Sequence, residues 1–178
     1  VYTEKELEQI AQYARENPQV YIISDDIYNR LVFTGEALAP HILKIAPDLK
    51  SRTLCINGVS KTFSMTGWRI GWAIGEENLI RAMSDYISQS TSSACSISQK
   101  ASVVALEQCE QDVVHAMKLL KERRDYAVAR IRSTPNLDVI LPEGAFYLWV
   151  NIEKSFGKRY KGHVISNSKD FCHYFLED

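Results

Sequence analysis

The stretch that decides the fold runs from Asn57 to Gly75 and reads N-G-V-S-K-T-F-S-M-T-G-W-R-I-G-W-A-I-G. The apolar run Thr53–Asn57 leads into it, and a second apolar run, Ile70–Ile74, lies near its end. Short apolar runs of this kind predict buried strands. Between the two expected strands, a compact polar loop carries a primary amine at Lys61 and, eight residues later, a guanidinium at Arg69. The loop is polar and reactive where its flanks are apolar.

A second site is indicated after the apolar run Gln19–Ile23, which predicts a strand buried on both faces of a parallel sheet. A helix is expected before this strand, because Thr3 and Glu6 have the spacing of a capping box. A helix that leads into a buried strand is typical of an α/β domain. Asp25 and Tyr28 follow the strand, where open α/β sheets place their ligands. An aspartate at this place can bind a charged group, and it can also cap the next turn.

Each part of the lysine loop also has a purely structural explanation when it is taken alone. A Ser-Lys pair is common in solvated turns, and an arginine before a strand is commonly a surface charge. A nucleotide-binding P-loop would need glycine directly before the lysine and again five positions earlier. Ser60 and Cys55 occupy these two positions, so a P-loop is excluded. Taken together with Asp25 and Tyr28, the loop favours a binding site over a solvated turn.

The two motifs together resemble those of the class I aminotransferases that use pyridoxal 5′-phosphate (PLP), the aspartate aminotransferase family. The resemblance implies that Lys61 is the catalytic Schiff-base lysine, which binds the aldehyde of PLP. It implies that Ser60 and Arg69 bind the cofactor phosphate. It also implies that Asp25 pairs with the pyridine nitrogen of PLP, and that Tyr28 donates a hydrogen bond to the 3′ oxygen of the ring.

The same resemblance implies an α/β fold, the fold type I of PLP-dependent transferases. Residues 1–125 are expected to form part of the large PLP-binding domain, with a mostly parallel sheet. Residues 126–178 are expected to form part of the smaller α+β domain. The boundary is placed inside a helix, because the apolar spacing over Asp112–Arg132 predicts one long helix. The runs Leu137–Leu141 and Phe146–Val150 predict a hairpin in the smaller domain.

The activity that the resemblance implies is transfer of an amino group between an amino acid, aspartate or aromatic, and a 2-oxo acid, by a homodimer. The family's upstream N-P-x-N-P-T-G element would precede Val1, and its arginine for the substrate carboxylate would follow Asp178. The chain is therefore expected to be an internal fragment that is weak or inactive alone. Two alternatives stay open. One is another fold type I PLP enzyme, such as a lyase or an aminotransferase of other specificity, and the other is a non-catalytic domain that binds no cofactor.

The composition is that of an ordinary globular protein, with 46% hydrophobic and 24% charged residues among 178. A formal net charge of -1 gives no electrostatic argument for nucleic acid or a membrane surface as a partner. No apolar stretch approaches the roughly 20 residues that span a membrane. The basic segment Lys154–Lys169 lacks an interleaved stacking pattern and is expected to be an exposed loop. Composition therefore leaves small molecules as the expected partners, and the family resemblance adds a second copy of the protein.

The cysteines and histidines show no metal-binding pattern, and no metal site is predicted. The four cysteines have neither C-x-x-C nor zinc spacing, and they are expected to be reduced, buried thiols of a cytoplasmic protein. The four histidines form no recognisable ligand cluster and are expected to be satisfied structural residues. Asp26 is assigned no direct role, because the three-residue spacing to Tyr28 selects Asp25.

Overall fold

The computed structural model describes residues 1–177. Contacts within the chain divide it into two compact units. The first comprises Val1–Lys118 with Glu143–Ala145, and the second comprises Leu119–Pro142 with the residues from Phe146 onward. The division falls inside a long helix, directly after residue 118, whereas the predicted domain boundary follows residue 125 of the same helix.

Helix α1 (Glu4–Glu16) begins where the capping-box spacing predicts. The Thr3 hydroxyl accepts a hydrogen bond from the Glu6 amide at 3.3 Å, and the Glu6 carboxylate accepts one from the Thr3 amide at 2.7 Å. The apolar face of α1 packs against α2 (Ile42–Ile45) and the 3-10 helix η1 (Pro47–Arg52). The buried side chains of this core are Leu7, Ala11, Ala14, Ile42, Ala46 and Leu49.

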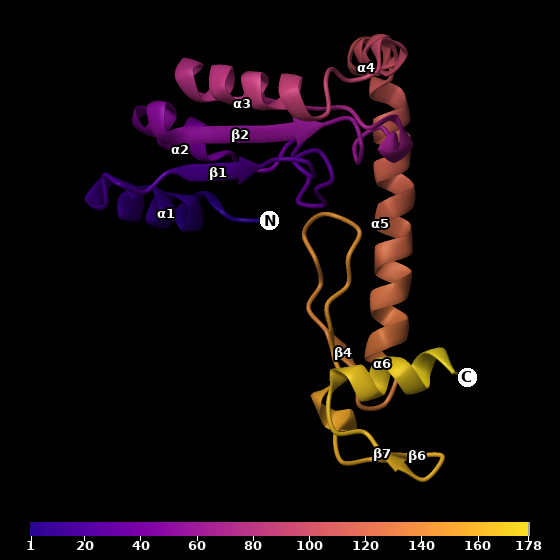
Figure 1. Ribbon diagram of the computed structural model, residues 1–178. Helices are drawn as coiled ribbons and strands as arrows, with labels where there is room; N and C mark the ends of the chain where they lie inside the picture. The colour runs from indigo at the N-terminus through magenta and orange to yellow at the C-terminus, as the bar shows by residue number, and fades with distance from the viewer. Residues whose placement is uncertain (178) are drawn as a thin grey trace. The chain divides into compact units, whose positions relative to one another are not determined.

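The sheet of the first unit has the strand order β1 (Ile22–Asp25), β2 (Thr53–Gly58) and β3 (Gly71–Ile74). β1 and β2 are parallel, as Figure 1 shows, and β2 and β3 are antiparallel. The two apolar runs that flank the lysine loop are therefore neighbouring strands. Asp25 pairs with Ile56, and Gly58 pairs with Gly71. Because of this register, the end of β1, the end of β2 and the start of β3 meet at one edge of the sheet.

Strand β1 differs from the prediction in two ways. It begins at Ile22 rather than at Gln19, because residues 17–20 form a turn whose carbonyl groups accept hydrogen bonds from the Arg52 guanidinium. The expectation that the strand is buried on both faces is wrong, since Ile23 is 67% exposed. Successive side chains of a strand point to opposite faces. Ile22 packs against the core of α1 and α2, so Ile23 lies on the face that these helices do not cover.

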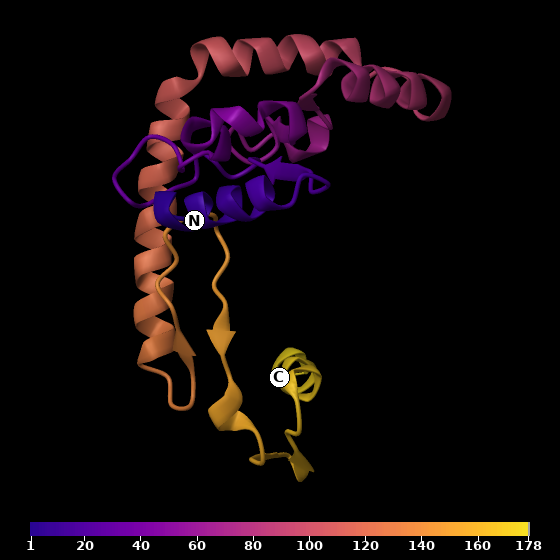
Figure 2. The same ribbon diagram turned by 90° about the vertical axis from the view of Figure 1, so that its left-hand side faces the viewer.

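Helices α3 (Glu77–Ser90), α4 (Ser96–Gln108) and α5 (Glu110–Arg132) follow the sheet and are joined by short connections (Figure 2). The long helix predicted over Asp112–Arg132 is confirmed as α5, which begins two residues earlier. Among the helices of residues 1–177, none combines the length and the apolar character that crossing a membrane requires.

The second unit begins with the later part of α5, from Leu119 onward. Its further described elements are β4 (Asp138–Val139), β5 (Val150–Asn151), η3 (Glu153–Ser155), β6 (Arg159–Tyr160), β7 (His163–Val164) and α6 (Ser168–Leu176). The predicted hairpin is confirmed only where β4 pairs with β5. The segment Lys154–Lys169 is mostly exposed, as expected for an insertion or loop, but it is not a loop throughout, because β6, β7 and the start of α6 lie there. Lys161 and Gly162 have φ values of 46° and 89°, which suit a two-residue turn between β6 and β7.

Candidate active site

Asp25 is the last residue of β1, and the chain turns directly after it. The Asp26 amide still donates to a carbonyl of β2 at 2.8 Å, and the Asn29 amide donates to the Asp26 carbonyl at 2.9 Å. The Asp25 carboxylate accepts a hydrogen bond from the Ile27 amide at 3.3 Å. The capping role that was left open for Asp25 is therefore present, and the compact turn that it caps carries Tyr28.

The lysine loop leaves the sheet at Gly58, where β2 and β3 come very close together. A Cβ atom on Gly58 would stand 2.7 Å from the Ile70 carbonyl oxygen, so this approach requires glycine. The next residue, Val59, is fully buried and anchors the loop. Ser60 and Lys61 follow this anchor and are half-buried. Their positions thus depend on the junction between β2 and β3.

The 3-10 helix η2 (Thr66–Trp68) returns the chain to β3 through Arg69. Arg69 has a φ of 56°, and its Nη1 atom donates to a carbonyl of η2 at 2.9 Å. The following residue, Ile70, is buried, and its carbonyl accepts a hydrogen bond from the Val59 amide at 3.4 Å. Because Val59 and Ile70 are paired in this way, their neighbours Ser60 and Arg69 are held beside the same strand junction.

Three of the five predicted cofactor contacts, Asp25, Ser60 and Arg69, line one cavity of about 300 Å³. A carboxylate from β1, a hydroxyl from the lysine loop and a guanidinium from the start of β3 therefore surround one space. Asn57 also lines this cavity, and the sequence patterns did not single it out as a site residue. Its place near the carboxyl end of a strand is the signal that could have found it.

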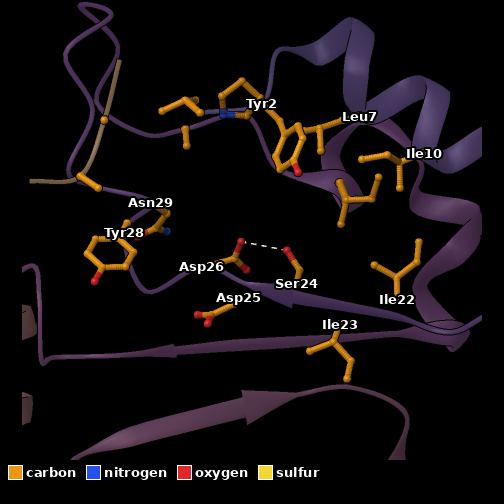
Figure 3. A pocket seen from close by; sticks show the side chains of 16 residues that line it. Tyr2, Leu7, Ile10, Ile22, Ile23, Ser24, Asp25, Asp26, Tyr28 and Asn29 are labelled. Carbon is orange, nitrogen blue, oxygen red and sulfur yellow. Dashed lines mark hydrogen bonds between the residues drawn. The ribbon is translucent and has the colours of Figure 1, made fainter. Parts of the chain in front are cut away.

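The other two predicted residues contact one another. The Lys61 Nζ atom lies 5.7 Å from the centroid of the Tyr28 ring, a distance at which an ammonium group is attracted to an aromatic face. Tyr28 and Asp25 line a second cavity of about 540 Å³ (Figure 3). Lys61 is absent from the described lining of both cavities and joins the group through Tyr28. Asp25 is shared by the two cavities and connects the two sets of residues.

A model of the family described as aminotransferase class I and II matches residues 1–178. The chain belongs to this family. Among the curated class I and II aminotransferases, a protein of Rickettsia bellii named "Probable aspartate/prephenate aminotransferase" is 44% identical over 178 residues. That match covers 99% of this chain and 44% of the relative. The aspartate/prephenate aminotransferase of Nitrosomonas europaea is 36% identical, with 99% of this chain and 45% of the relative covered.

Solved aminotransferase structures share the fold of this chain. The aspartate aminotransferase of Rhizobium meliloti has a TM-score of 0.95 and 38% identity, over 100% of this chain and 44% of that one. An aromatic aminotransferase of Pyrococcus horikoshii has a TM-score of 0.75 and 30% identity, over 83% of this chain and 39% of that one. The predicted fold class, an α/β part of the aspartate aminotransferase fold, is thereby confirmed. The chain spans less than half the length of these relatives.

Proposed function

We propose that the whole protein moves an amino group between an amino acid and a 2-oxo acid with PLP as its cofactor, and that this chain supplies the lysine and several cofactor contacts. One observation carries the proposal. In a chain of the aminotransferase family, Asp25, Ser60 and Arg69 line a single cavity, and Lys61 contacts Tyr28 beside it. The sequence separates these residues by up to 44 positions, and the strand register brings them together.

The chemistry of the five side chains fits PLP. A phosphate dianion is bound well by a guanidinium fork and a hydroxyl, which Arg69 and Ser60 provide. A protonated ring nitrogen requires a carboxylate, which Asp25 provides, and an anionic ring oxygen requires a hydrogen-bond donor such as the Tyr28 hydroxyl. Lys61 provides the amine that an aldehyde needs. The cavity of about 300 Å³ lies at the lower end of the range of small-molecule sites.

Each residue then has a defined task in the reaction. Bound PLP supplies a ring that withdraws electrons from the α-carbon of the substrate. Asp25 holds a proton on the ring nitrogen, and Tyr28 donates its hydroxyl proton towards the ring oxygen. The amine of Lys61 would bind the aldehyde of the cofactor, and in its free form it would accept the proton of the substrate α-carbon and deliver it to the cofactor. Arg69 and Ser60 hold the phosphate in place while this proton moves.

We propose aspartate or an aromatic amino acid as the amino donor. Aspartate is supported by the names of two relatives, which refer to aspartate and prephenate. An aromatic donor is supported by the name of the Pyrococcus horikoshii structure, an aromatic aminotransferase. The homodimer and the cytoplasmic location that the family resemblance implies also stay predictions for the whole protein. An assay with aspartate and 2-oxoglutarate tests the reaction, with oxaloacetate and glutamate as the expected products. Loss of a substrate group without transfer of the amine would instead indicate a lyase.

The site is tested by chemical trapping. PLP is added to this chain and to the full-length protein, both are reduced with borohydride, and the modified lysine is located by peptide mass spectrometry. We expect the label on Lys61. Lys61→Ala should remove this label and lower the turnover of the full-length protein by at least about a hundredfold, because it removes the proton-transferring group.

Lys50→Ala is the matched control, because Lys50 is an exposed lysine of the same unit. This variant should keep both the label on Lys61 and the turnover. Label scattered over surface lysines in both proteins would contradict the proposed cofactor site. Label on Lys61 in the full-length protein alone would support the enzyme and show that this chain does not bind the cofactor unaided.

A further inference from the structure

Asp26 is the most heavily hydrogen-bonded residue of the turn that carries Asp25 and Tyr28. Its carboxylate accepts a hydrogen bond from the Ser24 hydroxyl at 2.9 Å, drawn in Figure 3, and it lies 3.0 Å from the His41 Nε2 atom. Its backbone amide and carbonyl are bonded to β2 and to the Asn29 amide. The Asp26 side chain is only 17% exposed. Both its backbone and its side chain therefore hold the turn.

The bonding of His41 defines which of its nitrogen atoms carries the proton. The Nδ1 atom accepts a hydrogen bond from the Leu43 amide at 3.1 Å, where His41 caps α2. An atom that accepts this bond must keep its lone pair, so the proton of the neutral ring is on Nε2. The Nε2–H group faces the Asp26 carboxylate. His41 therefore donates its Nε2–H group to Asp26.

Asp26, His41 and Cys55 offer three potential metal-ligand atoms within 4.8 Å of one another. A histidine that binds a metal through Nε2 normally donates its Nδ1–H group to an acceptor. In this structure Nδ1 accepts a hydrogen bond from the Leu43 amide instead. The arrangement is thus that of a hydrogen-bonded network, in which the Cys55 sulfur lies 3.6 Å from His41 Nε2.

The network lies on the opposite face of β1 from Asp25. Ser24 precedes Asp25 on the strand, so its side chain points away from the face to which Asp25 points. The Asp26 carboxylate, just after the strand, accepts the Ser24 hydroxyl bond on that side (Figure 3). A second bond joins the same two segments, because the Ala39 amide donates to the Asn29 carbonyl at 2.8 Å. The chain before α2 therefore holds the turn through two hydrogen bonds, one to the Asp26 carboxylate and one to the Asn29 carbonyl.

We propose that Asp26 and His41 are a positioning pair, which acts through the turn to hold Asp25 and Tyr28 in the geometry that binds the cofactor. This inference rests on the proposed function. Neither residue touches the cofactor in this proposal. Removing the bond between them should loosen the turn while leaving the five predicted contact residues unchanged.

Two substitutions of His41 separate the two bonds of its ring. His41→Asn places an amide oxygen as far along the side chain as Nδ1, so it can cap α2 but cannot reach Asp26. His41→Gln places an amide N–H group as far along as Nε2, so it can donate to Asp26 without capping α2. We expect His41→Asn to weaken PLP binding about tenfold, and His41→Gln to stay within about twofold of the original chain. PLP binding is measured by titration of the visible absorption of the bound cofactor.

A second measurement needs no cofactor. Exchange of the Asp26 and Asn29 amide protons, followed by nuclear magnetic resonance, should become faster in His41→Asn and stay slow in His41→Gln. The reverse order, or equal behaviour of the two variants, would overturn the positioning pair and assign His41 to the capping of α2. Absence of specific PLP binding in the original chain would count against the proposed function of this chain, and the amide exchange would still decide the inference about the turn.

Discussion

Cys55 and Cys95 carry the same side chain in opposite surroundings. Cys55 lies half-buried on β2, where burial, and then the charge of Asp26, raise the pKa of its thiol. Cys95 is exposed at the start of α4, where the nearby backbone amides of Ser98 and Ile97 lower the pKa of its thiol. At any one pH, a larger fraction of Cys95 is therefore present as the reactive thiolate.

We expect iodoacetamide to alkylate Cys95 faster than Cys55 in the folded chain. As the pH is raised, the rate at Cys95 should begin to increase at a lower pH than the rate at Cys55. The measurement is peptide mass spectrometry after timed alkylation between about pH 6.5 and pH 9.5, a range around the ordinary pKa of cysteine. Cys172 is also exposed, so its alkylation rate shows how much of the difference is due to exposure alone. The expectation that the four cysteines are buried is therefore wrong at Cys95 and Cys172. In urea the rates should converge, and equal rates for Cys55 and Cys95 in the folded chain would refute the expectation.

Site residues could be predicted from the sequence where several of them belong to one motif. Lys61, Ser60 and Arg69 lie within nine residues of one another, so their spacing was visible in the sequence. His41 was expected to be a satisfied structural histidine, and both of its ring nitrogens do have partners. Its hydrogen bond to Asp26 could not be predicted, because the two residues are 15 positions apart and no periodic pattern in that segment would place one beside the other.

At the scale of elements, the junction of β2 and β3 controls the position of the lysine loop. Gly58→Ala would bring a Cβ atom to 2.7 Å from the Ile70 carbonyl, which forces the two strands apart. We expect this substitution to lower the free energy of unfolding by about 1–3 kcal/mol, the usual cost of overpacking. It should also reduce the covalent labelling of Lys61 by PLP. Urea denaturation and peptide mapping provide the two measurements.

Gly67→Ala is the matched control for this junction. A Cβ atom on Gly67 would meet nothing within 4 Å, so this variant should unfold and label like the original chain. Equal stability of the Gly58 and Gly67 variants would show that the strands do not depend on the close approach at Gly58.

Helices were easier to predict than strand boundaries and hairpins. The start of α1 follows from a local capping box, and α5 follows from a long apolar spacing. The start of β1 depends on Arg52, which is distant in the sequence and bonds the carbonyl groups of the preceding turn. The hairpin of β6 and β7 depends on a turn in which Lys161 adopts a positive φ. This conformation is uncommon for lysine, so the sequence does not predict the turn.

At the scale of the whole molecule, ion pairs and caps couple stability to pH. The pKa values of several carboxyl groups are lowered, that of Asp48 by the Arg15 guanidinium and that of Glu110 by Arg30. The backbone amide of Thr3 lowers the pKa of Glu6. A lowered pKa in the folded state means that the unfolded chain binds more protons in the window between the two pKa values. The stability from these groups is present above their ordinary pKa and is lost as the pH falls through the lowered values.

We therefore expect the free energy of unfolding in urea to change little from neutral pH to about pH 5, and to fall as the pH is lowered towards about 3. Circular dichroism across this pH series is the measurement. Arg15→Gln removes the partner of Asp48 and should make the acid-induced loss smaller. A free energy of unfolding that stays constant down to about pH 3 would contradict these pairs.

The division of the chain into two units was expected from the family resemblance, while the placing of the domain boundary after residue 125 stays a prediction. The contacts divide the chain directly after Lys118 and assign Glu143–Ala145 to the first unit. The reason is a pairing of backbone groups between two distant segments. The Phe33 amide donates a hydrogen bond to the Glu143 carbonyl, and the Ala145 amide donates one to the Leu31 carbonyl. A contact between segments so far apart in the chain has no signal in either segment alone.

The sequence by itself determined the family, the fold class and the residue types of the candidate site, because these depend on short-range spacing: the lysine loop, the Asp25 and Tyr28 pair and the helix signals. Only the tertiary structure decided which of these residues share a cavity, because the register of β1, β2 and β3 brings Asp25, Ser60 and Arg69 together. It also decided which face of β1 is covered and that His41 is hydrogen-bonded to Asp26. Such relations depend on pairing between distant segments, and local patterns do not specify that pairing.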